Sequence, residues 1–591
     1  MDTNTIHFIR LAEADELSFR LHEPISVTID SLSAILCCTP RNVKFILRRL
    51  EEKSFIRWQP GRGRGHTSVL TFMRSIDEAL EDSFQELMAK GKIKEAIELV
   101  GFSEVNEPLK ERLLSSLNKQ MGFHSEADTS SGQDVLRMMR ARRLEKLDPA
   151  YVYTAFESYL LGQICSTLIL YDAATQTFLP GLAHMWECSE DHRIWAFYLR
   201  KGVRFHHGRV MTSRDVKETL QRLIDLNSPA IWHYRDIERA EVEGDHCIRF
   251  YLRRPNLFFL HLFSCIHMSI LPYDVDIRTE IIGTGPYRVS DLNEDVLVLS
   301  AFDQYYGIRP HLDRVDIWFV PDHGPGERHY ELPGVDRMKL PAERCSTNSI
   351  DYPALGCRYM VFNFRKPGYQ HNHAFREAIR IVYDQVTLIR ELGGNRITPA
   401  SSFLPWKSSQ VDWTVCPSLE EARDLLIRSG YQGETIILGH TVHKDLEEAD
   451  WLKRRAAEIG LQIELHAFIE YKDDNMVSTA DLIMAEEVLE DDWQWGLINF
   501  FKNSSNYLHN YLESGQHSRL DCELESFAQL SGEDRAQLLD RVEGILREQH
   551  WILYGCHMNK KAQLNQSLFG LHTAAFGFLD ISKLWIKPGF Q

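Results

Sequence analysis

The sequence of 591 residues has no apolar run long enough to cross a bilayer. Its most apolar stretch, "LFFLHLFSCIHMSIL" at 257–271, has fifteen residues and contains His261 and His267. A membrane-spanning helix needs about 20 predominantly apolar residues, so a buried helix or strand is the better interpretation. The first residues also lack an apolar secretory segment, because charged side chains recur between Asp2 and Glu16. We therefore expect a cytoplasmic protein without a membrane partner.

Paired cysteines are also missing. The eleven cysteines are an odd number, and none of them forms a C-x-x-C pair. Disulfide frameworks and structural zinc sites both favour regularly spaced pairs. We expect reduced thiols, which agrees with a cytoplasmic location.

Sequence motifs of enzymes are absent as well. The chain has no nucleophile elbow, no zincin motif and no metal-binding loop. Neighbouring histidines occur, but we find no carboxylate or cysteine at ligand spacing beside them; these pairs are His206 and His207, His371 and His373, and His440 and His443. We therefore expect a protein that is not an enzyme, with no catalytic residue, metal site or cofactor.

Positive charge is scarce overall but concentrated near the N-terminus. The formal net charge is −17, yet residues 1–75 contain eleven Lys and Arg against eight Asp and Glu. Within residues 38–75 the ratio is nine to two. Because charge acts locally, this region is able to bind an anionic partner although the whole chain is acidic.

The basic region has the pattern helix, turn, helix, hairpin. Thr28 or Asp30 is able to cap a short helix that ends near Leu36. Thr39 is able to cap a second helix, with Pro40 at its first position, where the missing N–H is harmless. Two alternating segments follow, "SFIRW" (54–58) and "TSVLTF" (67–72), and they predict two strands.

The loop "QPGRGRGH" (59–66) between these strands has two possible roles: a phosphate cradle of a nucleotide enzyme, or the wing of a DNA-binding domain. Its pattern Gly61-x-Gly63-x-x-His66 lacks the third glycine of a dinucleotide loop, and no G-K-[ST] follows. The loop also joins two strands, whereas a phosphate cradle opens a helix. A wing is the better interpretation, since its arginines are able to reach the DNA backbone.

The second helix, about 40–53, has one apolar and one polar face. Its apolar stripe is Val43, Ile46, Leu47 and Leu50. Side chains on the other face suit a major groove; the base-contact candidates are Arg41, Asn42, Phe45 and Arg48. The phosphate-contact candidates are Lys44, Arg49, Arg62, Arg64 and His66. The alternatives are a solvated basic surface and, for Phe45, packing against the wing.

Residues 1 to about 115 resemble the N-terminal domain of the SgrR family of bacterial transcription regulators, chiefly through "LCCTPRNVKFILRRLEEKSFIRWQPGRGRG". The resemblance implies a winged helix-turn-helix fold (α+β) joined to a solute-binding domain. We expect the winged helix-turn-helix at 1–75 and a helical connector with a linker at 76–130. Apolar spacing in 76–100 predicts a helical hairpin, and "HSEADTSSGQD" (124–134) is the linker candidate.

From Asp134 onward, short apolar strands alternate with helical patterns, which indicates an α/β fold. This part of the sequence resembles family 5 extracellular solute-binding proteins, a peptide-binding class used by ABC importers. The matching segments include "YLRKGVRFHHGRVMTSRDV", "IIGTGPYRV", "YMVFNFRKPG" and "EEARDLLIRSGYQG". The resemblance implies a two-lobed, class II periplasmic-binding-protein-like domain. We expect lobe 1 at 131–357 plus 511–591, and lobe 2 at 358–510.

In peptide-binding relatives, an aspartate after the strand matching "ADLIMAEEVL" holds the α-amino group of the ligand. Here the sequence is "EEVLEDDWQWG", so Asp491 and Asp492 match that aspartate only loosely. Trp493 and Trp495 are aromatic candidates for the same ligand site. The alternatives are surface charge for the aspartates and core packing for the tryptophans. An oligopeptide, a sugar and a sugar phosphate remain open as the small-molecule ligand.

Together these observations favour a DNA-binding transcription regulator whose solute-binding domain senses a small molecule by lobe closure. Its expected partners are double-stranded DNA and that ligand, with a homodimer on DNA as one option. The alternative is the oligopeptide-binding component of an ABC transporter, which requires export or a lipid-anchoring cysteine near the start.

Overall fold

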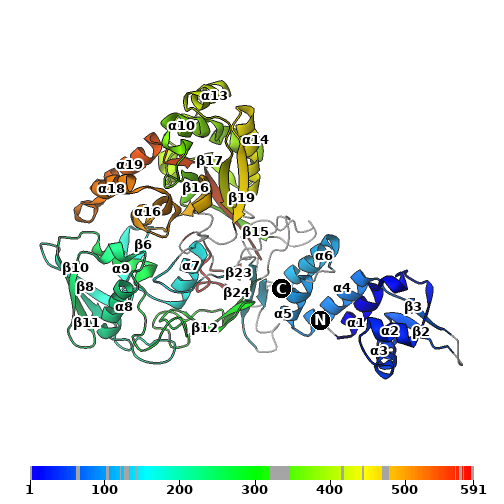
Figure 1. Ribbon diagram of the computed structural model, residues 1–591. Helices are drawn as coiled ribbons and strands as arrows, with labels where there is room; N and C mark the ends of the chain where they lie inside the picture. Colours follow the sequence, from blue (N-terminus) through cyan, green and yellow to red (C-terminus); the bar gives the residue numbers. More distant parts are fainter. Residues whose placement is uncertain are drawn as a thin grey trace. The chain divides into compact units, whose positions relative to one another are not determined.

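The computed structural model describes most of the chain, and this part divides into two compact units (Figure 1). One unit consists of residues 1–122 and the other of most of 123–591. The described residues are 3–61, 67–101, 105–119, 122–124, 132–140, 143–144, 146–152, 154–319, 347–413, 418–441, 445–468, 478–565, 568–570, 576 and 578–586. Within these ranges, no helix has the length and apolar character to cross a membrane.

The first unit combines six α-helices with a small sheet in its described part. Its elements are α1 (Thr3–Ala12), η1 (Asp15–Leu17), β1 (Pro24–Val27), α2 (Ile29–Ile35), α3 (Pro40–Glu52), β2 (Ile56–Gln59), β3 (Ser68–Phe72), α4 (Ile76–Ala89), α5 (Ile93–Val100) and α6 (Glu107–Lys119).

Local sequence explains the start of this unit. Thr28 caps α2 by accepting a hydrogen bond from the amide of Ser31, and Pro40 occupies the first turn of α3 after the N-cap Thr39. The strands β2 and β3 form an antiparallel hairpin in which Ile56 lies opposite Phe72. Strand β1, which the sequence pattern did not predict, pairs with the other side of β3.

The connector has three helices rather than the expected hairpin of two. Helix α4 begins with a capping box of Ser75 and Glu78, and Gly91 lies between α4 and α5 with a φ of 69°. The third helix, α6, buries Leu109, Leu113 and Leu117 completely, and it packs against α4 and α5. This four-residue leucine spacing was present in the sequence and indicates a helix.

The second unit has twenty-one strands in the described residues. They are β4 (Gly122–His124), β5 (Val135–Arg140), β6 (Ile169–Asp172), β7 (Thr177–Pro180), β8 (Ala183–Cys188), β9 (Ile194–Leu199), β10 (Ile237–Val242), β11 (Cys247–Leu252), β12 (Tyr287–Leu292), β13 (Val296–Ala301), β14 (Arg314–Phe319), β15 (Thr347–Pro353), β16 (Gly356–Phe362), β17 (Arg396–Pro399), β18 (Ile436–Thr441), β19 (Ile463–Phe468), β20 (Leu482–Val488), β21 (Ile552–Tyr554), β22 (Cys556–Asn565), β23 (Leu568–Phe569) and β24 (Trp585–Ile586).

Helices cover these strands. They are α7 (Ala155–Ile164), α8 (Ser213–Asp225), η2 (Ile231–Tyr234), α9 (Phe259–Ser264), η3 (Ile266–Met268), η4 (Tyr369–His371), α10 (His373–Val382), α11 (Gln385–Leu392), α12 (Pro405–Ser408), α13 (Leu419–Arg428), α14 (Leu446–Glu458), α16 (Trp493–Lys502), α17 (Tyr507–Tyr511), α18 (Ser514–Leu524), η5 (Phe527–Gln529) and α19 (Gly532–Glu548).

The first lobe of this unit is built on two larger sheets and a hairpin. The strand orders are β10-β11-β9-β8, β12-β13-β14-β5-β4 and β6-β7. The pairs within β8 to β11 and β12 to β14 are antiparallel. Helix α9, which comes from the apolar stretch at 257–271, packs against β6, so that stretch is a buried helix rather than a membrane span.

The second lobe is built on a mixed sheet of order β19-β18-β20-β16-β21. Strand β18 is parallel to β19 and β20, whereas β16 is antiparallel to β20 and β21. Every residue of β16 is buried, as expected for a central strand covered on both faces.

The chain returns to the first lobe later than the expected boundary at 511. Helix α19 packs on α16 and β21, and β21 is an edge strand of the second lobe's sheet. The return follows β22, and Tyr159 of α7 then donates a hydrogen bond to the carbonyl of Leu579 over 2.7 Å. Strand β21, with the sequence "ILY", completes the mixed sheet by pairing with β16. The two strands are far apart in the chain, so no local sequence pattern predicts their pairing.

Candidate functional site

The exposed face of α3 is the first candidate site. The stripe of Val43, Ile46, Leu47 and Leu50 is buried, as predicted. All six candidates for DNA contact on this helix are exposed to solvent; they are Arg41, Asn42, Lys44, Phe45, Arg48 and Arg49. The helix therefore packs on the protein with its apolar side and presents four cations on the other.

Two contacts on this face arrange its side chains. Arg48 Nε lies 3.1 Å from Glu52 Oε1 in an ion pair one helical turn apart. The Arg49 guanidinium lies 4.3 Å from the centre of the Phe45 ring. Phe45 is 52% exposed, so it does not pack into the hairpin as one interpretation of the sequence suggested. An exposed aromatic ring beside a cation remains available for a partner.

The hairpin stands beside α3. The amide of Trp58 in β2 donates to Glu51 Oε1 of α3 over 3.0 Å, which joins the strand to the helix. At the base of the loop, the amide of Gly61 donates to Ser68 Oγ over 3.1 Å. Arg62, Arg64 and His66 lie outside the described residues.

The contact between the two lobes of the second unit is the second candidate site. Figure 1 shows α9 close to α16. His261 Nδ1 of α9 hydrogen-bonds with Asp492 Oδ2, on the N-cap residue of α16. The other carboxylate oxygen of Asp492 accepts the amide of Trp495 over 3.2 Å and thereby caps α16. Both side chains are nearly buried, and both carboxylate oxygens of Asp492 are engaged, one between the lobes and one at the N-terminus of α16.

Trp495 is the centre of an aromatic stack between the lobes and is 1% exposed. Its ring is nearly parallel to that of Trp232, with centroids 6.2 Å apart, and lies 4.1 Å from the His233 ring. A backbone hydrogen bond of 2.7 Å from Leu257 to the carbonyl of Ala528 adds to this contact. The lobes are therefore in contact through packed, directional interactions.

The structure does not bring the four predicted ligand residues together at one point. Asp492 and Trp495 are buried in the lobe contact, and Asp491 is exposed. The half-buried Trp493 lies edge-on to Trp406, with ring centroids 6.1 Å apart. Trp493 and Trp495 are two positions apart on a helix, which points them to different sides.

Sequence analysis missed His261, Trp232 and His233 as parts of this contact. A signal for His261 was present, since a histidine within an apolar stretch needs a buried polar partner. The chain has 84 Asp and Glu residues, so the sequence offered no means of choosing Asp492 as that partner.

Acidic side chains gather beside this contact. Burial raises the pKa of Glu490 to about 8, although a hydrogen bond of 3.2 Å from Trp495 Nε1 opposes the shift. Asp491 is exposed to solvent, yet the protein around its carboxyl group partly desolvates it, and this desolvation raises the pKa of Asp491 to about 6. The site therefore holds carboxyl groups that prefer to be neutral or to face a cation.

We expect the stability of the protein to fall as the pH rises from about 4.5 to about 8, in part through Glu490. A raised pKa means that the folded state binds the proton more tightly than the unfolded state, so stability is lost in this window. The variant Glu490→Gln should show a flatter dependence of the unfolding midpoint on pH. Thermal unfolding between pH 5 and 8 measures this, and an unchanged slope would contradict the assignment.

No carboxylate was expected at metal-ligand spacing beside the paired histidines, but the structure places one beside His373. Glu377 follows His373 by one turn of α10, and His550 lies beside them; their ligand atoms are within 4.8 Å of one another. His373 Nε2 also lies 3.1 Å from the carbonyl of Glu548. Burial and the neighbouring Arg380 lower the pKa of His550 to about 4. The cationic setting opposes a metal cation here.

Comparisons with known proteins agree with the geometry of the second unit. Residues 177–507 match the bacterial extracellular solute-binding proteins, family 5. The solved dipeptide-binding protein of Pseudoalteromonas, in complex with Met-Leu, aligns with a TM-score of 0.65 over 77% of this chain and 100% of its own, at 18% identity. The chain belongs to the family 5 bacterial extracellular solute-binding proteins.

The N-terminal region identifies the chain as an SgrR-type protein, in which a regulator's N-terminal domain precedes the solute-binding domain. Residues 5–127 match the N-terminal domain described as a sugar transport-related sRNA regulator. The HTH-type transcriptional regulator SgrR of Yersinia enterocolitica is 30% identical over 349 residues, which are 58% of this chain and 59% of that protein. The Bacillus subtilis protein YhjP, whose function is uncharacterized, is 31% identical over 82% of this chain and 83% of its own length.

Proposed function

We propose that this protein is a DNA-binding transcription regulator controlled by a small molecule. In this proposal, residues 1–75 form a winged helix-turn-helix domain that binds double-stranded DNA, with α3 as the recognition helix and the β2–β3 loop as the wing. The family 5 domain senses the ligand by closure of its lobes. Such a regulator works in the cytoplasm, where the chromosome is.

The observation that carries this proposal is the two-sided character of α3. Its apolar stripe is buried, while its basic and amide side chains are exposed together on the other face. An α-helix with this face fits a major groove, where arginine reads guanine and an amide reads adenine. The ion pair between Arg48 and Glu52 is exposed, so Arg48 is able to exchange its partner at little cost.

Each candidate side chain has a role in this proposal. Arg41, Asn42, Phe45 and Arg48 would contact bases, and Lys44, Arg49, Arg62, Arg64 and His66 would contact phosphates. A single recognition helix reads a short site, so two copies on a palindromic operator form the expected complex.

The lobe contact supports ligand sensing. His261, Asp492 and the stack around Trp495 link the lobes, and the acidic segment with Glu490 and Asp491 suits a ligand with a cationic or amino group, as an oligopeptide has. A ligand is able to shift DNA binding only if it prefers one arrangement of the lobes, and typical coupling is about 1–3 kcal/mol.

Replacing Lys44 and Arg49 together with Gln should weaken DNA binding to every sequence. Each phosphate contact contributes about 0.9 to the slope of log affinity against log salt, so this slope should become flatter by about 2. Fluorescence anisotropy of the full chain with fragments from its own promoter region, between 50 and 200 mM salt, measures both effects.

The matched control is Lys92→Gln, because Lys92 is the exposed N-cap residue of α5 and forms an ion pair with Glu95. This control should leave the slope unchanged. If the unmodified chain shows no affinity for duplex DNA at low salt, the regulator proposal is wrong, and the role of a transporter's substrate-binding component becomes the better explanation.

A further inference from the structure

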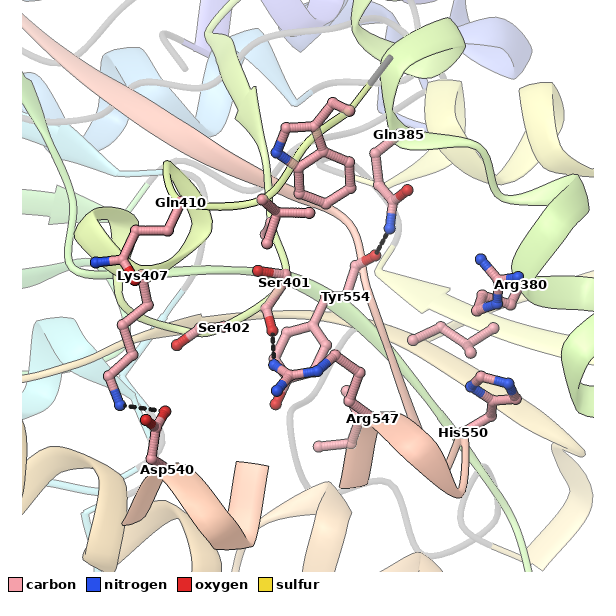
Figure 2. Close-up of a pocket in the computed structure, with 15 residues that line it drawn as sticks. Arg380, Gln385, Ser401, Ser402, Lys407, Gln410, Asp540, Arg547, His550 and Tyr554 are labelled. Carbon is pink, nitrogen blue, oxygen red and sulfur yellow. Dashed lines mark hydrogen bonds and ion pairs between the residues drawn. The ribbon is translucent and has the colours of Figure 1, made fainter. Parts of the chain in front are cut away.

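The second lobe contains a cavity of about 500 Å³ that is separate from the lobe contact. Its walls come from the ends of α10 and α19, from α11, α12 and β21, and from the segment after β17. Neither His261, Asp492 nor Trp495 lines it. Figure 2 shows Arg380 and His550 on one side of this cavity, Lys407 and Asp540 on the other, and Ser401, Arg547 and Tyr554 between them.

The lining has an excess of positive charge. Arg380, Lys407 and Arg547 are cationic, and Asp540 is the single carboxylate among the described lining residues. Lys407 Nζ lies 2.7 Å from Asp540 Oδ1 and 4.0 Å from Glu543 Oε2, so this lysine is already balanced. No carboxylate of the described lining lies in an ion pair with Arg380 or Arg547; the buried Glu543 behind the lining attracts both Lys407 and Arg547, and the lining keeps an excess of positive charge for a ligand.

Hydrogen bonds hold Arg547 and a neighbouring amide in position. Arg547 Nη1 donates to the carbonyl of Ser401 over 2.6 Å, which anchors its guanidinium (Figure 2). The Gln385 amide donates to the carbonyl of Tyr554 over 2.7 Å. His550 is neutral at physiological pH because burial and Arg380 lower its pKa to about 4, so its imidazole is a hydrogen-bonding group without charge.

The remaining wall suits a carbon skeleton. Val411 and the half-buried Trp413 line the cavity, and Trp413 Nε1 donates to the carbonyl of Ser408 over 3.2 Å, which orients its ring. Gln410 and Ser401 add polar groups that are able to bind hydroxyls. The combination of two guanidinium groups with an aromatic wall fits a small organic dianion rather than a neutral or cationic ligand.

We propose that this cavity, named here the Arg380–Arg547 pocket, is a binding site for a small organic molecule with a dianionic group, either a phosphate ester or a dicarboxylate. The two arginines would bind the charged group, and Trp413 would pack on the carbon part. The site is distinct from the lobe contact and from the DNA-binding face, so the protein has a place for a second chemical signal.

Isothermal titration calorimetry of the full chain tests this proposal with two probes, glycerol 3-phosphate and succinate, against glycerol as the neutral control. At least one dianion should bind and glycerol should not. Binding of glycerol 3-phosphate alone would identify a phosphate site, and binding of succinate alone a dicarboxylate site. Failure of both dianions to bind would overturn the proposal, whatever the result for DNA.

Variants locate the site. Arg380→Gln and Arg547→Gln should each lower the affinity at least about tenfold, since each removes a charge-assisted hydrogen bond. Arg541→Gln, at an exposed arginine of α19 outside the cavity, should stay within about twofold, because surface changes away from a site have small effects. Unchanged unfolding midpoints establish that the variants fold, and equal affinity in all three variants would overturn the proposal.

Discussion

Arg358→Ala is expected to lower the free energy of unfolding of the second unit by about 3–5 kcal/mol, the usual cost of removing one partner from a buried ion pair. Arg358 is 2% exposed on the central strand β16. It forms ion pairs with Asp445 and, at 2.7 Å, with Glu448. Burial alone would lower the pKa of Arg358, but attraction to Glu448 and Asp445 outweighs burial and raises the pKa well above its usual value.

The loss would leave two carboxylates without their main cation. Arg396 remains 3.3 Å from Glu448, but it also pairs with Glu447, so it compensates only in part. Denaturant unfolding followed by circular dichroism measures the change. Arg390→Ala is the matched control, because Arg390 is an exposed arginine beside Glu391 and its loss should cost less than about 0.5 kcal/mol. Equal effects of the two variants would contradict the importance of the buried network.

Asp492→Asn is expected to weaken the lobe contact while preserving the start of α16. Asparagine is as good an N-cap as aspartate, but it removes the charged partner of His261, and a hydrogen bond to a charged group contributes about 1.5–3 kcal/mol. Asp492→Ala should cost about 1 kcal/mol more, because it also loses the cap on the amide of Trp495.

A double-mutant cycle with His261→Ala separates the pair from other effects. If the two side chains act together, the double variant should cost clearly less than the sum of the single variants. Asp491→Asn is the control, since Asp491 is exposed and adjacent in sequence. Additive single costs would mean that the contact between His261 and Asp492 contributes nothing to holding the lobes together.

Local patterns predicted much of the first unit. The stripe of Val43, Ile46, Leu47 and Leu50 and the two hairpin strands are present in the structure, and Thr28 is the one of the two predicted candidates that caps α2, because each feature depends on residues close in sequence. Strand β1 was missed, since a four-residue segment has too little periodicity to be recognised without its partner β3.

The predicted ligand residues illustrate the limit of such patterns. The sequence offered Asp491, Asp492, Trp493 and Trp495 as ligand contacts, and the structure places Asp492 and Trp495 in contact with residues of the first lobe. The local sequence could not show whether Asp492 is available to a ligand, because its partner His261 lies 231 residues away in the chain. The Arg380–Arg547 pocket was missed for the same reason, as its lining comes from five elements and a connecting segment that no spacing connects.

The sequence by itself determined the family, through its resemblance to known motifs. It also determined the concentration of positive charge in the first 75 residues and the two faces of α3, because these depend on composition and helical periodicity. The tertiary structure alone decided that β21 joins the second lobe, that Asp492 is paired with His261 and that two arginines share a cavity. The physical reason is that partnerships between distant side chains are selected by burial and charge balance after the chain has folded, and these quantities have no local sequence signal.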